Sequence, residues 1–322
     1  MTVESIYKKI RAKLAGPKEM ACENSFDYYY NSPKTNSGDY NKKILTDEQA
    51  NEWLTKTILA GKPFFASRFG GFELGLVCNH LFNRVINKKL WSKYSLEMLA
   101  RDAAWHGDIK KQESFYDGFL RSVHSIDGLG VWFNHGEDVM ANYICPGAEL
   151  FELIAYEPYF YAKPWTMALE NKKVLVIHPY TSTIPLQYAK RDLLFNQLVL
   201  PFFHLQCYKP FSTYDNEWMK FENIQATLDK MINDISKLDF DIALIASGPQ
   251  GLPLGAAIKK MNRQAIHVGG ALQLFFGILG KRWEEPGRPQ QVFFNEHWVR
   301  PHTSEIPTDA RALKFSDAGC YW

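Results

Sequence analysis

Residues 240–280 read FDIALIASGPQGLPLGAAIKKMNRQAIHVGGALQLFFGILG, and this stretch decides the fold. It begins with an apolar run, Phe240 to Ala246, whose β-branched and aromatic residues are typical of a strand buried on both faces. SGPQG then turns the chain into a helix with Pro253 in its first turn, and a second strand follows from Gln264 to Val268. A further helix is predicted over ALQLFFGIL. Because helical crossovers join parallel strands, the stretch predicts an α/β fold with a Rossmann-like, mostly parallel sheet flanked by helices.

The turns that follow these two strands are the first candidate ligand site. In a parallel sheet, ligands bind at the carboxyl ends of the strands, so the loops Ser247–Gly251 and Val268–Gly270 are expected to face a ligand. Free backbone N–H groups at the helix start after SGPQG can hold a phosphate. The candidate binding residues in these loops are Ser247, Gly248, Pro249, Gln250, Gly269 and Gly270.

An earlier strand, predicted over residues 62–69, ends in a second turn of this kind. Gly70 and Gly71 lead from it into a helix, and Arg68 and Glu73 flank the turn. If this strand runs parallel to the later ones, both side chains belong to the same site. The structural alternative is that Glu73 only stabilises the first turn of its helix and Arg68 only pairs with Glu73.

A third turn follows the strand predicted over Lys173–Ile177. It reads HPYTSTIP, in which Thr181, Ser182 or Thr183 can cap the next helix and leave backbone N–H groups for a phosphate. The sequence therefore predicts two helix starts that can bind a phosphate, this one and the one after SGPQG.

Titratable side chains also occur at predicted strand ends. His178 and His267 each follow a strand, where each can act on a ligand or be a hydrogen-bonded structural group. A strand predicted from Gly128 to Phe133 leads into NHGED, which contains His135 and Glu137. A polar surface turn is the alternative interpretation of that segment.

The chain has 322 residues, of which 46% are apolar, enough for the core of one large α/β domain or two smaller ones. We predict a helical and loop extension over residues 1–60 and a Rossmann-like domain over residues 61–322. Two halves of that domain are expected to meet near the aromatic linker at residues 156–172. Near the end of the sequence, NEHWVRP and GCYW concentrate side chains that can close over a cleft.

Charge and cysteine usage limit the partners and the compartment. The 37 Lys and Arg residues nearly balance the 35 Asp and Glu residues, so the overall charge does not indicate a nucleic-acid-binding protein. Five widely spaced cysteines without a CxxC pattern fit a reducing cytoplasm. No apolar segment approaches the ~20 residues of a membrane span. Residues 4–14 form an amphipathic basic pattern, which predicts either peripheral contact with an anionic membrane surface or an ordinary solvated helix.

Several enzyme motifs are missing from the sequence. It contains no P-loop, HExxH, GxSxG or full dinucleotide glycine fingerprint. The string DFD at residues 239–241 imitates the Asp-x-Asp metal motif of many sugar-nucleotide transferases, but it precedes its strand and therefore lies at the edge opposite the predicted site. We interpret it as unrelated to metal binding.

Two segments resemble a known family. SRFGGFEL at residues 67–74 is similar to the RxGDGEF-type segment of the bacterial D-type glycosyltransferase fold (GT-D), and ASGPQGLPLGAAIKKMNRQAIHVGG matches that fold's strand, GP turn, helix and strand. HPYTSTI, HVGGALQLFFGILGKRW, HWVRP and GCYW look like a subgroup often encoded with surface-polysaccharide genes. The likeness covers roughly residues 60–322.

The resemblance implies a transferase that uses a nucleotide-diphosphate sugar, commonly a UDP-sugar, to extend a glycan or a lipid-linked acceptor. The family's Asp-x-Glu motif, implicated in binding Mn²⁺ or Mg²⁺ with the nucleotide, is here Gly71-Phe72-Glu73. Glu73 matches the second acid, but Gly71 replaces the first. Since a hard cation prefers several oxygen ligands, this departure puts metal use in doubt.

The residues allow a hypothesis for the mechanism. Glycosyl transfer needs stabilisation of the departing diphosphate and deprotonation of the acceptor hydroxyl. The SGPQG and TST helix starts can supply the first, assisted by Arg68 or by Lys281 and Arg282. Glu73 is the first candidate for the base or for a metal ligand, and His178 and His267 come next.

Two other functions compete with this one. The missing acid at Gly71 is compatible with a protein that binds nucleotide-sugars without turnover. A Rossmann-like methyltransferase fits the alternation of strands and helices but lacks a glycine-rich loop followed by a ribose-binding acid.

Overall fold

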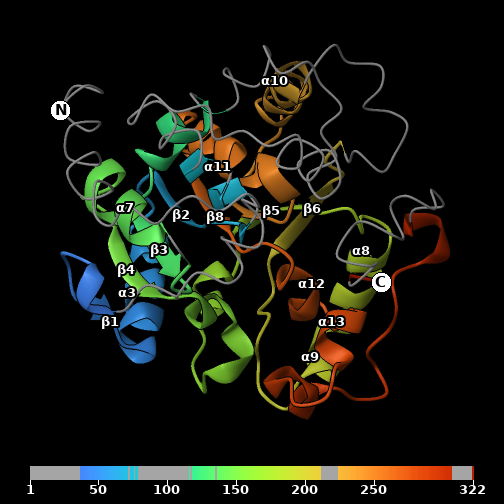
Figure 1. Ribbon diagram of the computed structural model, residues 1–322. Coiled ribbons are helices and arrows are strands. Elements are labelled where there is room, and N and C mark those ends of the chain that lie inside the picture. The colour runs from blue at the N-terminus through green and yellow to red at the C-terminus, as the bar shows by residue number, and fades with distance from the viewer. Residues whose placement is uncertain are drawn as a thin grey trace, which may run out of the picture.

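The computed structural model describes residues 37–71, 73–75, 77–78, 116, 118–134, 136–211, 224–306 and 321–322. These residues contain an eight-stranded sheet in which every pair of neighbouring strands is parallel (Figure 1). The strand order is β1-β4-β3-β2-β8-β7-β5-β6. The strands are β1 Ile44–Leu45, β2 Phe64–Arg68, β3 Gly128–Val131, β4 Glu149–Glu152, β5 Lys173–Ile177, β6 His204–Tyr208, β7 Ile242–Ile245 and β8 Gln264–His267.

The predicted α/β fold with a parallel sheet is confirmed. The sequence predicted β2, β3, β5, β7 and β8, most of whose side chains are buried on both faces of the sheet, and it also predicted β6, as a strand around Val199–Tyr208. The centre of the sheet is the unit from residue 240 to residue 270, since β8 pairs with β2 on one side and with β7 on the other.

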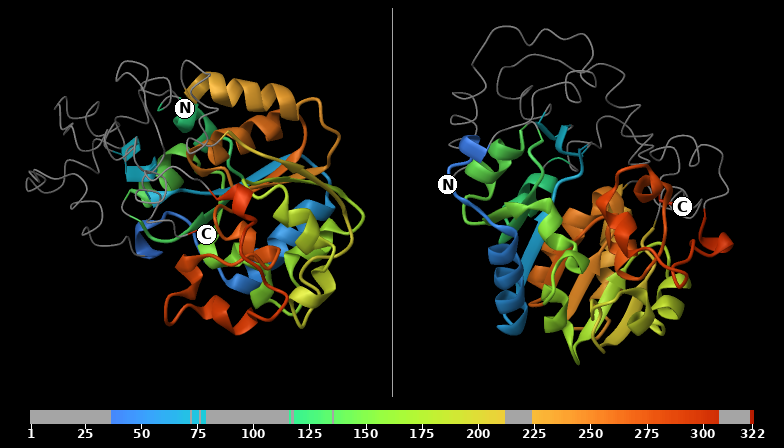
Figure 2. Two further views of the ribbon diagram at one scale, coloured as in Figure 1. Left: turned by 90° about the vertical axis from the view of Figure 1, so that its right-hand side faces the viewer. Right: turned by 90° about the horizontal axis from the view of Figure 1, so that it is seen from below.

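Two hydrophobic cores lie on the two faces of this sheet, and β2 shows how the sequence builds both. Phe65 belongs to one core, whereas Phe64 and Ala66 belong to the other, because successive side chains of a strand point to opposite faces. Helices cover each face, and the left view of Figure 2 shows α10 and α11 on one side and α3 and α8 on the other.

The first core is covered by α10 (Ile224–Ile235), α11 (Gly251–Lys260), α7 (Glu137–Val139), the π-helix Met140–Ile144 and the helical residues 118–123. The second core is covered by α3 (Asp47–Leu59), α8 (Thr183–Tyr188), α9 (Arg191–Leu194), α12 (Leu272–Phe275) and α13 (Lys281–Glu284). Short 3₁₀ helices span Ser37–Asp39, Leu153–Tyr156, Pro158–Phe160, Trp165–Leu169, Gly248–Gln250, Pro289–Phe293 and Thr303–Glu305.

Helix α3 begins where its sequence predicts. Thr46 is the N-cap, and its hydroxyl accepts a hydrogen bond from the Gln49 N–H while the Gln49 side chain accepts one from the Thr46 N–H. This reciprocal pair is a capping box, which satisfies two of the backbone donors that a helix start leaves open.

The helix predicted over ALQLFFGIL is much shorter than expected. Helix α12 ends at Phe275, and Gly277 follows with φ +60, a left-handed conformation that ends the helix. Ile278 then forms a parallel bridge with Val299, which ties this segment to the chain after α13. Apolar composition predicted burial correctly but not the helix end, since burial in this segment does not depend on helical structure.

Residues 37–60 belong to the same α/β unit as the rest of the described chain. Strand β1 is an edge strand of the sheet, and Ala50, Leu54 and Ile58 of α3 lie in the second core. The boundary predicted at residue 60 therefore does not separate an extension from the sheet. Residues 156–172 connect β4 to β5, and the sheet is continuous between the two predicted halves. Residues 4–14 lie outside the described residues.

The DFD string lies at the amino ends of the strands, as expected, and its acids have structural partners. Asp239 forms ion pairs with Lys173 and Arg263, and Asp241 accepts a hydrogen bond from the Lys173 N–H at 2.8 Å. Among the described residues, every helix falls short of the length and apolar character that a membrane span requires.

Candidate functional site

The carboxyl ends of β2, β8, β7 and β5 lie side by side at one edge of the sheet. These four strands are consecutive neighbours and run in the same direction, so the loops after them share that edge. After β5 the chain crosses to β6, whereas after β7 it crosses to β8 on the other side. Such a reversal opens a crevice between the two loops, the usual ligand site of an open α/β sheet.

The loop after β7 needs its two glycines for different reasons. Gly248 has φ +56, which other residues rarely adopt. Gly251, the first residue of α11, lies against the ring of His267, and a Cβ atom there would come within 2.4 Å of His267 Nε2. Therefore the start of α11 packs directly on the end of β8.

The His267 ring joins three elements. Its Nδ1 atom is hydrogen-bonded to the Ser67 hydroxyl of β2 at 3.2 Å, and its other side contacts Gly251. The side chain is only 4% exposed, and burial together with the nearby Arg68 charge lowers the pKa of His267 well below its usual range. A neutral, bridging imidazole favours the structural interpretation of this histidine over a role as a base.

Arg68, the last residue of β2, lies against the loop after β8. A Cβ atom at Gly269 would come within 2.2 Å of Arg68 Nη2, and Gly269 itself has φ +77. Both the contact and the backbone conformation require glycine at this position. Arg68 and Gly269, which the sequence predicted separately as site residues, therefore lie together at the carboxyl edge.

Glu73 covers the turn that follows β2. Its carboxylate lies so close to Gly70 that a Cβ atom at that position would be 1.8 Å from Glu73 Oε2. Gly71 and Glu73 are in the helix that begins after the turn, where the Leu74 N–H donates to the Gly70 carbonyl at 3.0 Å. Glu73, Gly70, Gly71 and Arg68 therefore occupy the end of β2, next to the loop of β8.

His178, the residue after β5, is buried. Its Nδ1 accepts a hydrogen bond from the Tyr180 N–H at 3.0 Å, and burial lowers the pKa of His178 to about 3. An imidazole whose conjugate acid is this strong is a poor base. The geometry indicates that His178 shapes the loop rather than accepting a proton from a ligand.

The TST turn has a partner that the sequence did not indicate. Ser182 is the N-cap of α8 without a side-chain cap, and the Ser182 and Thr183 N–H groups donate to the Glu305 carboxylate at 2.6 and 3.2 Å. The Thr183 hydroxyl also hydrogen-bonds to Glu305. The Glu305 carboxylate thus accepts hydrogen bonds from the same N–H groups that we predicted to bind a phosphate. Thr181 lies just before these residues.

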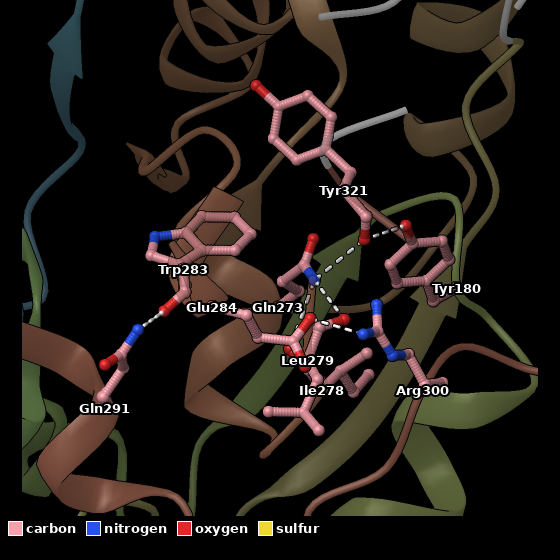
Figure 3. A network of polar contacts seen from close by, with 9 residues as sticks. All are labelled: Tyr180, Gln273, Ile278, Leu279, Trp283, Glu284, Gln291, Arg300 and Tyr321. Carbon is pink, nitrogen blue, oxygen red and sulfur yellow. Dashed lines mark hydrogen bonds and ion pairs between the residues drawn. The ribbon is translucent and has the colours of Figure 1, made fainter. Parts of the chain in front are cut away.

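Lys281 and Arg282 begin α13, and Arg282 is joined to Tyr321. Arg282 Nη1 donates to the Tyr321 hydroxyl at 3.0 Å, and the Tyr321 carbonyl accepts from the Tyr180 hydroxyl at 2.9 Å and from Gln273 Nε2 at 3.1 Å. Figure 3 shows the Tyr321 carbonyl between the side chains of Tyr180 and Gln273. Tyr321 of the predicted GCYW segment therefore lies at the carboxyl edge, whereas Gly319 and Cys320 lie outside the described residues.

Gln250 is placed differently from its neighbours in the SGPQG loop. Its side chain is 5% exposed and lines a cavity of about 160 Å³ that extends along α11 toward Lys260. This cavity lies between α11, α10 and the helical residues 118–123, on one face of the sheet. Ser247, Gly248 and Pro249 stay at the strand end.

Glu137 is the most perturbed acid near this edge. Its carboxylate is fully buried and accepts hydrogen bonds from the Trp132 and Phe133 N–H groups at 3.0 and 2.8 Å and from the Tyr40 hydroxyl at 3.1 Å. Burial raises the pKa of Glu137 to about 7, although these hydrogen bonds oppose the rise. It stabilises the turn after β3, where Phe133 has φ 64. His135 lies outside the described residues.

The acids of the site do not form the metal centre that the family resemblance implies. Glu73 is a single carboxylate, and the position of the second acid is Gly71. In the part of the chain that the structure describes, no three His, Cys, Asp or Glu side chains gather where a metal ion could bind. Because a hard cation prefers several oxygen ligands, we derive no chemical step through a metal.

No protein-family model matches the chain, and a search of curated proteins finds no match. Two solved structures are similar to it. One is described as the highly conserved domain of unknown function 1792 with a distinct glycosyltransferase fold, with 13% identity, a TM-score of 0.45, and coverage of 89% of this chain and 94% of the other. A selenomethionine-substituted structure of the same kind of domain has 12% identity, a TM-score of 0.44 and coverage of 89% and 93%.

Proposed function

We propose that the chain is a glycosyltransferase that moves a sugar from a nucleoside-diphosphate sugar, such as a UDP-sugar, to a hydroxyl group of a glycan or lipid-linked acceptor. One observation carries the proposal. The Arg68 guanidinium, held against Gly269, lies at the same edge as the start of α11, which His267 ties to the end of β8. A cation at the same sheet edge as a helix start is suited to a diphosphate.

The proposed reaction uses these groups in a simple way. The bond between the anomeric carbon of the sugar and the diphosphate breaks, while the acceptor oxygen forms a new bond to that carbon. Arg68 and the positive end of the α11 helix dipole stabilise the charge on the departing diphosphate, while the Gly251 N–H itself donates to the Gly248 carbonyl. The Glu73 carboxylate takes the proton of the acceptor hydroxyl. The products are the glycosylated acceptor, the nucleoside diphosphate and a proton on Glu73.

Glu73 is preferred as the base over the histidines for a physical reason. The pKa of His178 and that of His267 are both lowered by burial, so both rings are weak bases. Glu73 is only partly buried and lies over the turn that Arg68 begins. A position at the rim leaves its carboxylate within reach of an acceptor.

Calorimetry tests the ligand class. We expect UDP to bind more tightly than CMP or S-adenosylmethionine. GDP, a second nucleoside diphosphate, tests the preference for the nucleobase. Each titration is repeated with Mn²⁺ to test metal dependence. Exclusive binding of S-adenosylmethionine would end the transferase proposal. Tight UDP binding without hydrolysis or transfer to any acceptor would favour the alternative of a non-catalytic binding protein, for which the missing acid at Gly71 is the supporting feature.

Turnover of Glu73→Gln tests the role of the base. The substitution keeps the size of the side chain and removes its charge, so we expect turnover to fall about 10²- to 10⁴-fold while UDP binding is retained. Glu52→Gln is the matched control, because Glu52 is an exposed glutamate on α3 that pairs with Lys56. Near-normal turnover by Glu73→Gln would exclude its proposed role.

A further inference from the structure

Two glycines, Gly270 and Gly280, leave the space that Tyr321 occupies. A Cβ atom at Gly270 would be 2.3 Å from Tyr321 Cε1, and one at Gly280 would be 2.9 Å from the Tyr321 carbonyl oxygen. Any larger residue at Gly270 would displace the ring. Gly270 precedes α12 and Gly280 is the N-cap of α13, so the chain leaves room for Tyr321 before and after the segment that joins them.

Polar groups fix the backbone of Tyr321 in the same place. Its carbonyl accepts one hydrogen bond from the Tyr180 hydroxyl and one from Gln273 Nε2 (Figure 3). Gln273 is only 1% exposed, and its amide group also donates to the Ile278 and Leu279 carbonyls. A buried amide with several acceptors is held rigidly, so it defines one position for the Tyr321 carbonyl.

These contacts place Tyr321 across the carboxyl edge of the sheet. Tyr180 belongs to the loop after β5, and Gly270 belongs to the loop after β8. Strand β7 lies between these two strands, and neighbouring strands are about 4.8 Å apart. Tyr321 therefore joins the loops on either side of the SGPQG loop.

The side chain of Tyr321 holds Arg282. Arg282 Nη1 donates to the Tyr321 hydroxyl at 3.0 Å, and the guanidinium carbon lies 4.8 Å from the centre of the Tyr321 ring. The two contacts restrict a long side chain through a hydrogen bond and a cation–π interaction. Trp283, the next residue of α13, also contacts Tyr321, with the two ring centres 5.9 Å apart.

We infer that Tyr321 is a positioning residue that holds Arg282 for the diphosphate of the donor. This inference rests on the proposed function, because it assigns Arg282 to the same ligand as Arg68. Both arginines are tied to the loop after β8, Arg68 by its contact with Gly269 and Arg282 through Tyr321, which contacts Gly270. A guanidinium that is already held loses less conformational freedom when it binds a phosphate.

A double-mutant cycle tests this inference. UDP and UMP affinities are measured by calorimetry for the wild type, Tyr321→Phe, Arg282→Gln and the double variant. Tyr321→Phe keeps the ring and the carbonyl contacts but removes the hydrogen bond to Arg282, so we expect UDP binding to weaken about three- to tenfold. Arg282→Gln is expected to weaken it about tenfold or more. In the Arg282→Gln background, Tyr321→Phe should have no further effect.

The comparison of UDP with UMP separates positioning from a structural role. If Tyr321 acts through Arg282, both single variants reduce the gain in affinity that the second phosphate gives. Equal losses for UDP and UMP, or a Tyr321→Phe effect that persists without Arg282, would overturn the inference. Tighter UDP binding by Tyr321→Phe would also overturn it, because Tyr321 would then be competing with the ligand.

Tyr161→Phe is the matched control, because Tyr161 is a partly buried tyrosine in the connection between β4 and β5. It should bind UDP like the wild type, and a loss equal to that of Tyr321→Phe would overturn the inference. If the wild type binds no nucleoside diphosphate at all, the proposed function itself fails. Wild-type binding with no effect of Arg282→Gln contradicts only the role of Arg282 and Tyr321.

Discussion

The guanidinium group of Arg68 lies against the α-carbon of Gly269, two residues beyond the end of the neighbouring strand β8. This contact gives the arginine at the end of β2 a fixed place at the carboxyl edge. It also explains why position 269 is glycine, since a side chain there would occupy the space of the guanidinium group.

Gly269→Ala should weaken UDP binding and lower the free energy of unfolding. A methyl group would displace Arg68, and alanine at φ +77 costs about 1–2 kcal/mol. Chemical denaturation and calorimetry measure the two effects. Gly287→Ala is the control for backbone strain alone, because Gly287 has φ +86 with no atom near its added Cβ. If both variants bind UDP equally well, Arg68 does not need the space at Gly269.

Glu137 should make the protein less stable as the pH rises. The folded state raises the pKa of Glu137 from 4.5 to about 7, so between these values the folded protein holds a proton that the unfolded chain has lost. This contribution to stability is fully present below pH 4.5 and is lost as the pH rises through 7. From pH 5 to pH 8 the loss amounts to about 2 kcal/mol.

Glu137→Gln should remove this pH-dependent loss of stability, which urea denaturation at pH 5 and pH 8 measures. Glu152→Gln, an exposed acid on β4, is the control. An unchanged pH dependence in Glu137→Gln would show that the acid is charged in the folded state.

His178 should have the opposite effect. The unfolded side chain binds a proton near pH 6.5, but the folded one stays neutral down to about pH 3. Stability is therefore lost as the pH falls below 6.5, by about 2 kcal/mol between pH 7 and pH 5. His178→Asn retains an acceptor for the Tyr180 N–H and should show a smaller loss on acidification in the same denaturation experiment. His204→Asn is the control, since His204 is exposed on β6. Equal acid sensitivity of His178→Asn and the wild type would contradict the prediction.

Glu305 should stabilise the start of α8. Its carboxylate accepts hydrogen bonds from two backbone N–H groups, so Glu305→Ala leaves those donors to water and should lower the free energy of unfolding by about 1 kcal/mol. Glu296→Ala, at a highly exposed acid, should change it little. The prediction fails if the two variants have the same midpoint of chemical denaturation.

The sequence predicted six of the eight strands and missed the two on one side of the sheet, β1 and β4. Most side chains of β5 and β7 are apolar and buried on both faces, so their composition alone indicates strands. Strand β4 reads ELFE and strand β1 has only two residues, so neither has an apolar run long enough to be recognised. The end of α12 depends on the backbone of Gly277, which composition does not reveal.

The candidate site was predicted as a set of strand ends, and the structure brings these strand ends to one edge. The contacts between them were not predictable, because they join residues that are far apart in the chain. Glu305 lies 123 positions from Ser182, and Tyr321 lies 141 positions from Tyr180. Glycines were the residues most informative about these contacts, because Gly251, Gly269 and Gly270 each lie against a side chain from another segment.

The alternation of β2 between the two cores fixes which way Arg68 points. Phe65 and Phe64 enter opposite cores, so odd-numbered residues of this strand face one core and even-numbered residues face the other. A deletion or insertion of a single codon within β2 would exchange the places of Arg68 and Ser67, whereas a change of two codons would preserve them. Natural length variation in this segment is therefore expected to occur in even steps or outside the strand.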